Sequence, residues 1–131
     1  MDASEWYSEL NKPLWAPPDW VFAPVWTFLY TLIFISFGWV FWMYLKGEVP
    51  FSVVLPFFLN LLFNFAFTPL QFGLQNNILA SFDLFLVLVT LVWAMFVVWP
   101  YARWVFYFQI PYFVWVLFAT VLQFSIAYLN F

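Results

Sequence analysis

The sequence contains neither cysteine nor histidine. Their absence excludes disulfides, thiol nucleophiles, imidazole bases and the usual zinc ligands. Charged residues make up only 7% of the 131 positions, whereas soluble domains carry about a quarter, which excludes a water-soluble globular fold. Three Lys and Arg against six Asp and Glu leave no basic surface for phosphate groups, so we expect no nucleic-acid partner.

What the sequence does have is apolar residues, 68% of the total, with 29% aromatic. A helix needs about 20 consecutive apolar residues to cross the hydrocarbon core of a bilayer. Four stretches meet this length, at 24–45, 51–72, 78–99 and 104–128. They lack the alternation of polar and apolar residues that barrel strands show. We therefore predict an integral, multi-pass, all-α membrane protein, a bundle of four transmembrane helices forming one domain over residues 1–131.

Residues 1–23 differ from the rest because they combine charges with prolines and tryptophans. This composition does not fit a signal peptide, which needs a basic start and an apolar middle. Tryptophan is typical of the boundary between water and lipid. We expect an interfacial segment there that acts as a lid. Cytoplasmic loops of membrane proteins carry an excess of Lys and Arg. Lys46 and Arg103 lie on one side of the predicted bundle and Lys12 on the other, so we expect the side with Lys46 and Arg103 to face the cytoplasm.

Polar and small residues recur at helical spacing within the spans. The stripe on the second span consists of Asn60, Asn64, Thr68 and Gln71. The first span carries a stripe of Trp26, Tyr30 and Phe37, and the last span one of Trp115, Ala119, Gln123 and Ala127. Such stripes line one face of a helix. Packing between helices through small residues and hydrogen bonds explains them as well as a ligand site does.

The depth of these residues favours a pocket. Trp26 and Asp83 lie near the beginning of their spans, and Asn64 and Gln123 near the end of theirs. All four then lie within about 12 Å of the same membrane surface, the one from which residues 1–23 emerge. An apolar pocket with a few polar groups is the usual form of a small-molecule site. Asp83 is the one ionisable residue inside a span, which makes it a functional candidate, or a structural acid near a helix N-terminus.

Three segments resemble the TspO/MBR family, the tryptophan-rich sensory and translocator proteins. Residues 6–30 carry the family's Trp/Pro loop and following helix, in the pattern KPxWxPPxWxFxPVWTxLY. Residues 64–73, NFAFTPLQFG, are similar to its N-x-x-W-S-P-x-F-F-G segment. Residues 111–120, PYFVWVLFAT, are similar to the PYxxWxxFAT segment of its final helix.

The resemblance implies a bundle, often a homodimer, with a ligand pocket beneath the Trp/Pro loop. Family ligands include porphyrins, sterols and synthetic isoquinoline and benzodiazepine drugs. Carried over to this sequence, the resemblance implies that Trp26 and Asn64 hydrogen-bond the ligand. The implied wall residues are Tyr30, Phe67, Asp83, Trp115 and Ala119, and the implied lid residues are Trp15, Pro17, Pro18 and Trp20. We add Gln123 to the wall because of its depth in the final span.

The sequence also departs from the family pattern. Family members usually have a further helix before the Trp/Pro loop, and only five residues precede Trp6 here. We expect a partner subunit, lipid or a rearranged bundle to cover the missing wall. Phe67 stands where the family has Trp, Gln71 replaces Phe, and Gln123 replaces Asn. No basic residue follows Arg103, which disfavours sterol binding at the end of the final helix.

These observations predict a membrane-embedded receptor or carrier for a hydrophobic small molecule, a porphyrin or related tetrapyrrole. We expect no required cofactor, no metal site and no catalytic residue. One alternative is a proton-coupled exporter with Asp83 as the exchanging carboxylate. Another is a membrane enzyme, either one that degrades porphyrins in light or one that modifies isoprenoids.

Overall fold

The computed structural model describes residues 6–7 and 9–130, and within these ranges it contains helices and loops but no strand. Among the described residues, four helical segments are long and apolar enough to cross a membrane, at Phe22–Leu45, Phe51–Gly73, Asn77–Val98 and Arg103–Leu129. The predicted all-α membrane fold is confirmed. The elements in chain order are η1 (Asp19–Val21), α2 (Phe22–Leu45), α3 (Phe51–Thr68), η2 (Pro69–Gly73), α4 (Asn77–Val98), α5 (Arg103–Phe108) and α6 (Ile110–Leu129).

The first span, α2, has Pro24 in its first turn, where a missing N–H breaks no hydrogen bond. It ends at a tight turn in which Gly47 has a φ of 76°, a conformation that glycine adopts without steric cost. The N–H of Glu48 donates to the carbonyl of Met43 at 2.8 Å, which closes the helix end. The chain then reverses into α3.

The second span is not one regular helix. After Thr68 the chain forms a π-helical turn, η2, in which the N–H of Leu74 donates to the carbonyl of Pro69 at 2.8 Å. Pro69 has no N–H to offer the carbonyl of Phe65, so the α-helical pattern loses a bond at this point. The wider turn carries Gln71, which is fully buried.

The fourth span is also divided. The short helix α5 ends at Phe108, and α6 begins at Ile110, with Pro111 in its first turn. Pro111 cannot donate to the carbonyl of Tyr107, and this loss explains the break. Gln109, at the junction, donates from Nε2 to Ser36 Oγ at 2.8 Å. The break is therefore attached to α2.

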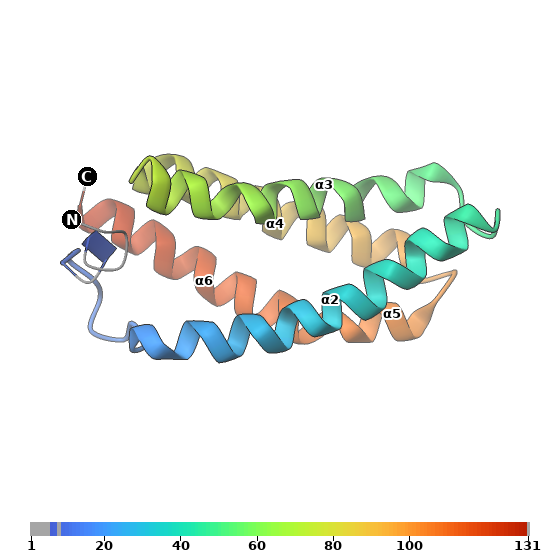
Figure 1. Cartoon of the computed structure of the whole chain (residues 1–131), viewed down its shortest axis with the longest axis horizontal. Coiled ribbons are helices and arrows are strands. Elements are labelled where there is room, and N and C mark those ends of the chain that lie inside the picture. Colours follow the sequence, from blue (N-terminus) through green and yellow to red (C-terminus); the bar gives the residue numbers. More distant parts are fainter. Residues whose placement is uncertain (1–5, 8, 131) are drawn as a thin grey trace.

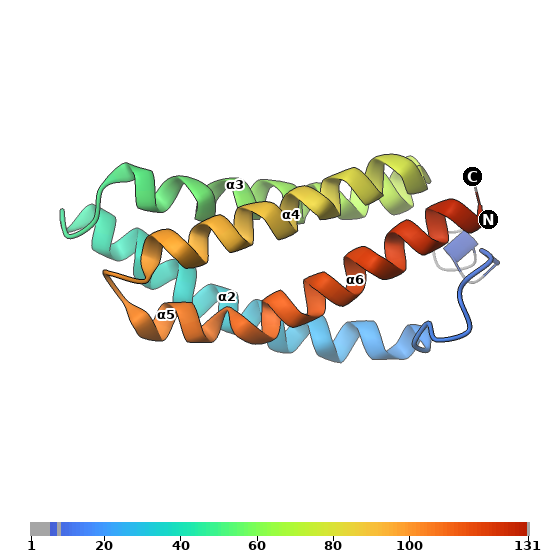
Figure 2. The same cartoon turned by 180° about the vertical axis from the view of Figure 1, so that it is seen from behind.

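Figures 1 and 2 show how the spans are arranged. Helices α3 and α4 lie side by side along most of their length. Helix α2 approaches α3 near the loop that joins them and then diverges from it towards the other end of the bundle. The N-terminal segment lies at that open end, beside the end of α6.

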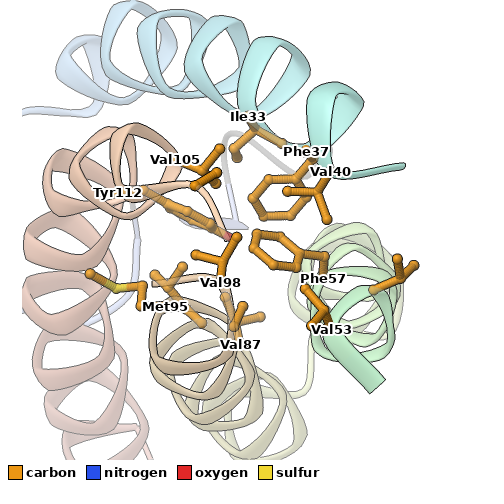
Figure 3. Packing of buried hydrophobic residues seen from close by; sticks show 14 of the residues in the cluster. Ile33, Phe37, Val40, Val53, Phe57, Val87, Met95, Val98, Val105 and Tyr112 are labelled. Atoms are coloured by element: carbon orange, nitrogen blue, oxygen red, sulfur yellow. The ribbon is translucent and has the colours of Figure 1, made fainter. Parts of the chain in front are cut away.

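The half of the bundle near the α2–α3 loop is filled with apolar side chains (Figure 3). The rings of Phe37 and Phe57 meet edge to face with centroids 4.8 Å apart, a favourable aromatic geometry. Val40, Val98 and Val105 pack in the same cluster and are completely buried. The bundle is thus solid in this half, and α2 diverges from α3 in the other.

Candidate ligand-binding cavity

A cavity of about 530 Å³ lies in the half of the bundle where α2 and α3 diverge. Pockets for drug-sized molecules range from about 300 to 1,000 Å³. Its walls come from α2, α3, η2, α4, α6 and the N-terminal segment, through Tyr7, Phe22, Trp26, Tyr30, Asn64, Phe67, Thr68, Gln71, Phe72, Leu84, Val87, Trp115, Ala119, Leu122 and Gln123. The cavity is mostly apolar and aromatic, with polar groups at a few points.

Aromatic rings form the wall between α2 and α6. The indole of Trp26 lies 5.4 Å from the ring of Tyr30 with a tilt of 33°. It also meets Trp115 nearly at a right angle, with centroids 6.5 Å apart. Phe22 also meets Trp115 edge to face, with ring centroids 5.7 Å apart. Ala119 lies one turn after Trp115 on α6 and leaves space beside these rings. Such a wall suits a flat, apolar organic molecule.

A chain of hydrogen bonds runs from the cavity into the core. The hydroxyl of Tyr30 donates to Asn64 Oδ1 at 2.8 Å, and Asn64 Nδ2 donates to the hydroxyl of Tyr112 at 2.7 Å. Tyr112 in turn donates to Asn60 Oδ1 at 2.8 Å. Asn60 Nδ2 donates to the backbone carbonyl of Val87 at 2.9 Å. The chain joins α2, α3, α4 and α6 at the border between the cavity and the solid half.

The backbone carbonyl at the inner end fixes the direction of this chain. Because the carbonyl of Val87 can only accept, Asn60 must turn its NH₂ group towards it and its oxygen towards Tyr112. Tyr112 therefore donates to Asn60 and accepts from Asn64. Asn64 then presents its oxygen to Tyr30. The amide of Asn64 thus reaches the cavity in one defined orientation.

A second polar group lies at the end of the cavity near η2. Gln123 Nε2 donates to Gln71 Oε1 at 2.8 Å and to the backbone carbonyl of Asn77 at 3.3 Å. The hydroxyl of Ser81 approaches the carbonyl of Gln123 at 3.3 Å. This pair of glutamines joins η2, α4 and α6, and both side chains are buried.

The structure brings together all of the predicted ligand-binding residues except Asp83: Trp26, Tyr30, Asn64, Phe67, Trp115, Ala119 and Gln123 line one cavity. Asp83 is buried, with 6% of its surface exposed, but does not line this cavity. Its neighbour Leu84 does, and the two side chains point about 100° apart around the helix. Depth along the chain placed Asp83 at the right level, but it did not fix the direction of its side chain around α4.

The four predicted lid residues, Trp15, Pro17, Pro18 and Trp20, do not line the cavity. Trp15 packs against Phe118 on α6, with ring centroids 5.7 Å apart. Trp20 is 73% exposed. Among the described residues that precede α2, Tyr7 lines the cavity, and its ring meets those of Phe22 and Phe72 at centroid distances of 6.2 and 5.7 Å.

The N-terminal segment is attached to the end of α6. The N–H of Asn11 donates to Asn130 Oδ1 at 3.0 Å, and Asn130 Nδ2 donates back to the carbonyl of Asn11 at 2.8 Å. These two bonds join residues 119 positions apart in the sequence. They hold the loop on the same end of the bundle as the cavity.

Sequence reasoning did not assign several wall residues to the site: Tyr7, Phe22, Thr68, Gln71, Phe72, Leu84, Val87 and Leu122. Thr68 and Gln71 belong to the stripe that contains Asn64, so their spacing was a usable signal. The apolar ones carry no signal in the sequence, because a leucine at a cavity wall is indistinguishable from one in a core. Within residues 6–7 and 9–130, no three acidic, histidine or cysteine side chains are grouped as a metal site would require.

Comparison with known proteins agrees with this architecture. The TspO/MBR family matches residues 1–129. The tryptophan-rich protein TspO of Chlorobaculum tepidum is 35% identical over 98% of this chain and 81% of its own length. TspO of Archaeoglobus fulgidus is 33% identical over 95% and 80%. The human translocator protein is 40% identical over 63% of this chain and 48% of its own length. The chain is an integral, multi-pass membrane protein that belongs to the TspO/MBR family.

Proposed function

We propose that this protein is a membrane-embedded receptor or carrier that binds a flat, hydrophobic small molecule, a porphyrin or related tetrapyrrole. The observation that carries the proposal is the cavity of about 530 Å³, with an aromatic wall on one side and hydrogen-bonding groups at two points. Relatives are named a tryptophan-rich sensory protein and a translocator protein, and such names suit a protein that binds a small molecule in a membrane.

Binding draws on two kinds of interaction. The rings of Trp26 and Trp115 offer stacking and apolar contact area, which supply most of the affinity in pockets of this type. Asn64, held by Tyr112, supplies an amide whose orientation is set before the ligand arrives. Preorganisation of this kind raises affinity because little conformational freedom is lost on binding.

The test is titration of the purified protein with protoporphyrin IX, read by quenching of tryptophan fluorescence. We expect saturable binding that weakens about 10-fold or more in Trp26→Ala, since an aromatic wall is lost. Asn64→Ala is expected to weaken it as well. Trp93→Ala is the matched control, because Trp93 is a half-exposed tryptophan on α4 outside the cavity. Equal affinity in wild type, Trp26→Ala and Asn64→Ala would remove the proposed site.

The exporter alternative depends on Asp83, which would have to meet the transported molecule. Asp83 does not line the cavity, and this favours the receptor or carrier over a carboxylate exchanger. Porphyrin affinity in Asp83→Asn equal to that of wild type is the expected result. Mass analysis of the bound porphyrin after illumination separates binding from enzymatic breakdown, because only an enzyme changes the ligand.

A further inference from the structure

Two buried N–H groups on residues of the cavity wall have no hydrogen-bond partner among the described residues. They are the side-chain Nε2 of Gln71 and the indole Nε1 of Trp115. Both are donors. Buried polar groups are nearly always paired, so an unpaired one in a binding site indicates what a ligand should supply. Here the unpaired groups call for acceptors.

The orientation of the Gln71 amide is determined by its neighbours. The backbone carbonyl of Asn77 can only accept, so Gln123 must turn its NH₂ group towards it. The same NH₂ group donates to Gln71 Oε1 at 2.8 Å. A flipped Gln71 would place two NH₂ groups against each other. Gln71 therefore keeps its oxygen towards Gln123 and its own N–H groups available for another partner.

Two other polar groups of the cavity already have partners within the bundle. Tyr30 and Asn64 are bonded to each other, and Asn64 is bonded to Tyr112. No lysine or arginine lines the cavity within the part of the chain that the structure describes. A free carboxylate would enter an apolar site without a cation to balance it, which is strongly unfavourable. A neutral carbonyl oxygen has no such penalty.

We propose that Gln71, held in place by Gln123, is a carbonyl-binding subsite that donates an N–H to a neutral ester, amide or ketone oxygen of the bound hydrophobic molecule. The subsite rests on the proposed function, since it lies in the same cavity. Gln71 is fully buried, so the proposal requires a small movement of the wall before a ligand carbonyl can reach its Nε2. We expect that movement in the π-helical turn η2, which carries Gln71.

The test compares three porphyrins of similar shape: protoporphyrin IX dimethyl ester, protoporphyrin IX with free carboxylates, and etioporphyrin, which has no carbonyl group. We expect the wild-type protein to bind the ester about 5- to 100-fold more tightly than etioporphyrin, the range for pairing a buried donor. The ester is also expected to bind more tightly than the free acid at pH 8.

The variant Gln71→Leu removes the donor at similar volume. We expect it to abolish the preference for the ester over etioporphyrin while etioporphyrin affinity stays within about 3-fold of wild type. Gln109→Leu is the matched control, since it makes the same change at a buried glutamine outside the cavity, and it is expected to keep the preference. A preference that survives Gln71→Leu overturns the subsite.

Infrared spectroscopy of the bound dimethyl ester keeps the proposal testable even if Gln71→Leu does not fold. A hydrogen-bonded ester carbonyl in the wild-type protein absorbs at lower frequency than the same ester in detergent alone. An unshifted carbonyl band overturns the proposal, and so does a free acid that binds more tightly than the ester. If none of the three porphyrins quenches tryptophan fluorescence, the proposed function fails as well. If all three bind equally, only the carbonyl subsite fails.

Discussion

Replacing Tyr112 with phenylalanine removes a single oxygen atom from the centre of the bundle. Tyr112 is completely buried, and its hydroxyl both accepts from Asn64 and donates to Asn60, at 2.7 and 2.8 Å. The variant Tyr112→Phe keeps the ring and its packing. It leaves one buried donor and one buried acceptor without their partner.

The expected loss follows from these two bonds. Hydrogen bonds between helices in membrane proteins contribute about 0.6 kcal/mol on average and up to about 1.7 kcal/mol each. Loss of both predicts a decrease of about 1 to 3 kcal/mol in the free energy of unfolding. Asn60 keeps its bond to the carbonyl of Val87, so the inner end of the chain of hydrogen bonds stays attached to α4. We therefore expect a less stable protein with an unchanged fold.

The assay is unfolding by SDS in mixed micelles, followed by circular dichroism. Tyr30→Phe is the matched control, because it removes the hydroxyl at the other end of the same chain, where Tyr30 is 40% exposed. Loss of the Tyr30 hydroxyl removes one hydrogen bond, to the Asn64 oxygen that borders the cavity. We expect Tyr30→Phe to lower the free energy of unfolding by about 0.5 kcal/mol or less. A double-mutant cycle with Asn60→Leu isolates the bond between Tyr112 and Asn60. The reasoning is refuted if Tyr112→Phe costs no more than Tyr30→Phe.

Three further changes test other parts of the structure. Gln109→Leu removes the bond that attaches the α5–α6 break to Ser36 and should lower the unfolding free energy by about 1 to 2 kcal/mol in the same assay; a neutral effect would contradict a structural role. Asn130→Ala removes both bonds to Asn11, and we expect faster hydrogen exchange at the Asn11 amide, with an unchanged rate arguing against the attachment. Ala119→Trp should fill the cavity and lower protoporphyrin affinity about 10-fold or more without loss of stability, and undiminished affinity would place the ligand elsewhere.

Much of the fold followed from the order of residues alone. In lipid every backbone group must find its partner within the protein, so four long apolar runs had to become four helices. Pro111 lies at the break between α5 and α6, where it removes one backbone donor from the helix, whereas Pro56 lies inside α3 without interrupting it. The helical spacing of Asn60 and Asn64 also predicted that both lie on one buried face. The homodimer stays a prediction.

The cavity itself was a matter of tertiary structure. Its space exists because α2 diverges from α3 at the end of the bundle opposite their loop, and the angle between two helices depends on side chains far apart in the sequence. The same packing turned Leu84 towards the cavity and Asp83 away from it, and it brought Tyr7 rather than Trp20 to the wall. Residue number fixes the depth of a side chain in a membrane helix, but only the neighbouring helices decide which directions around that helix remain open.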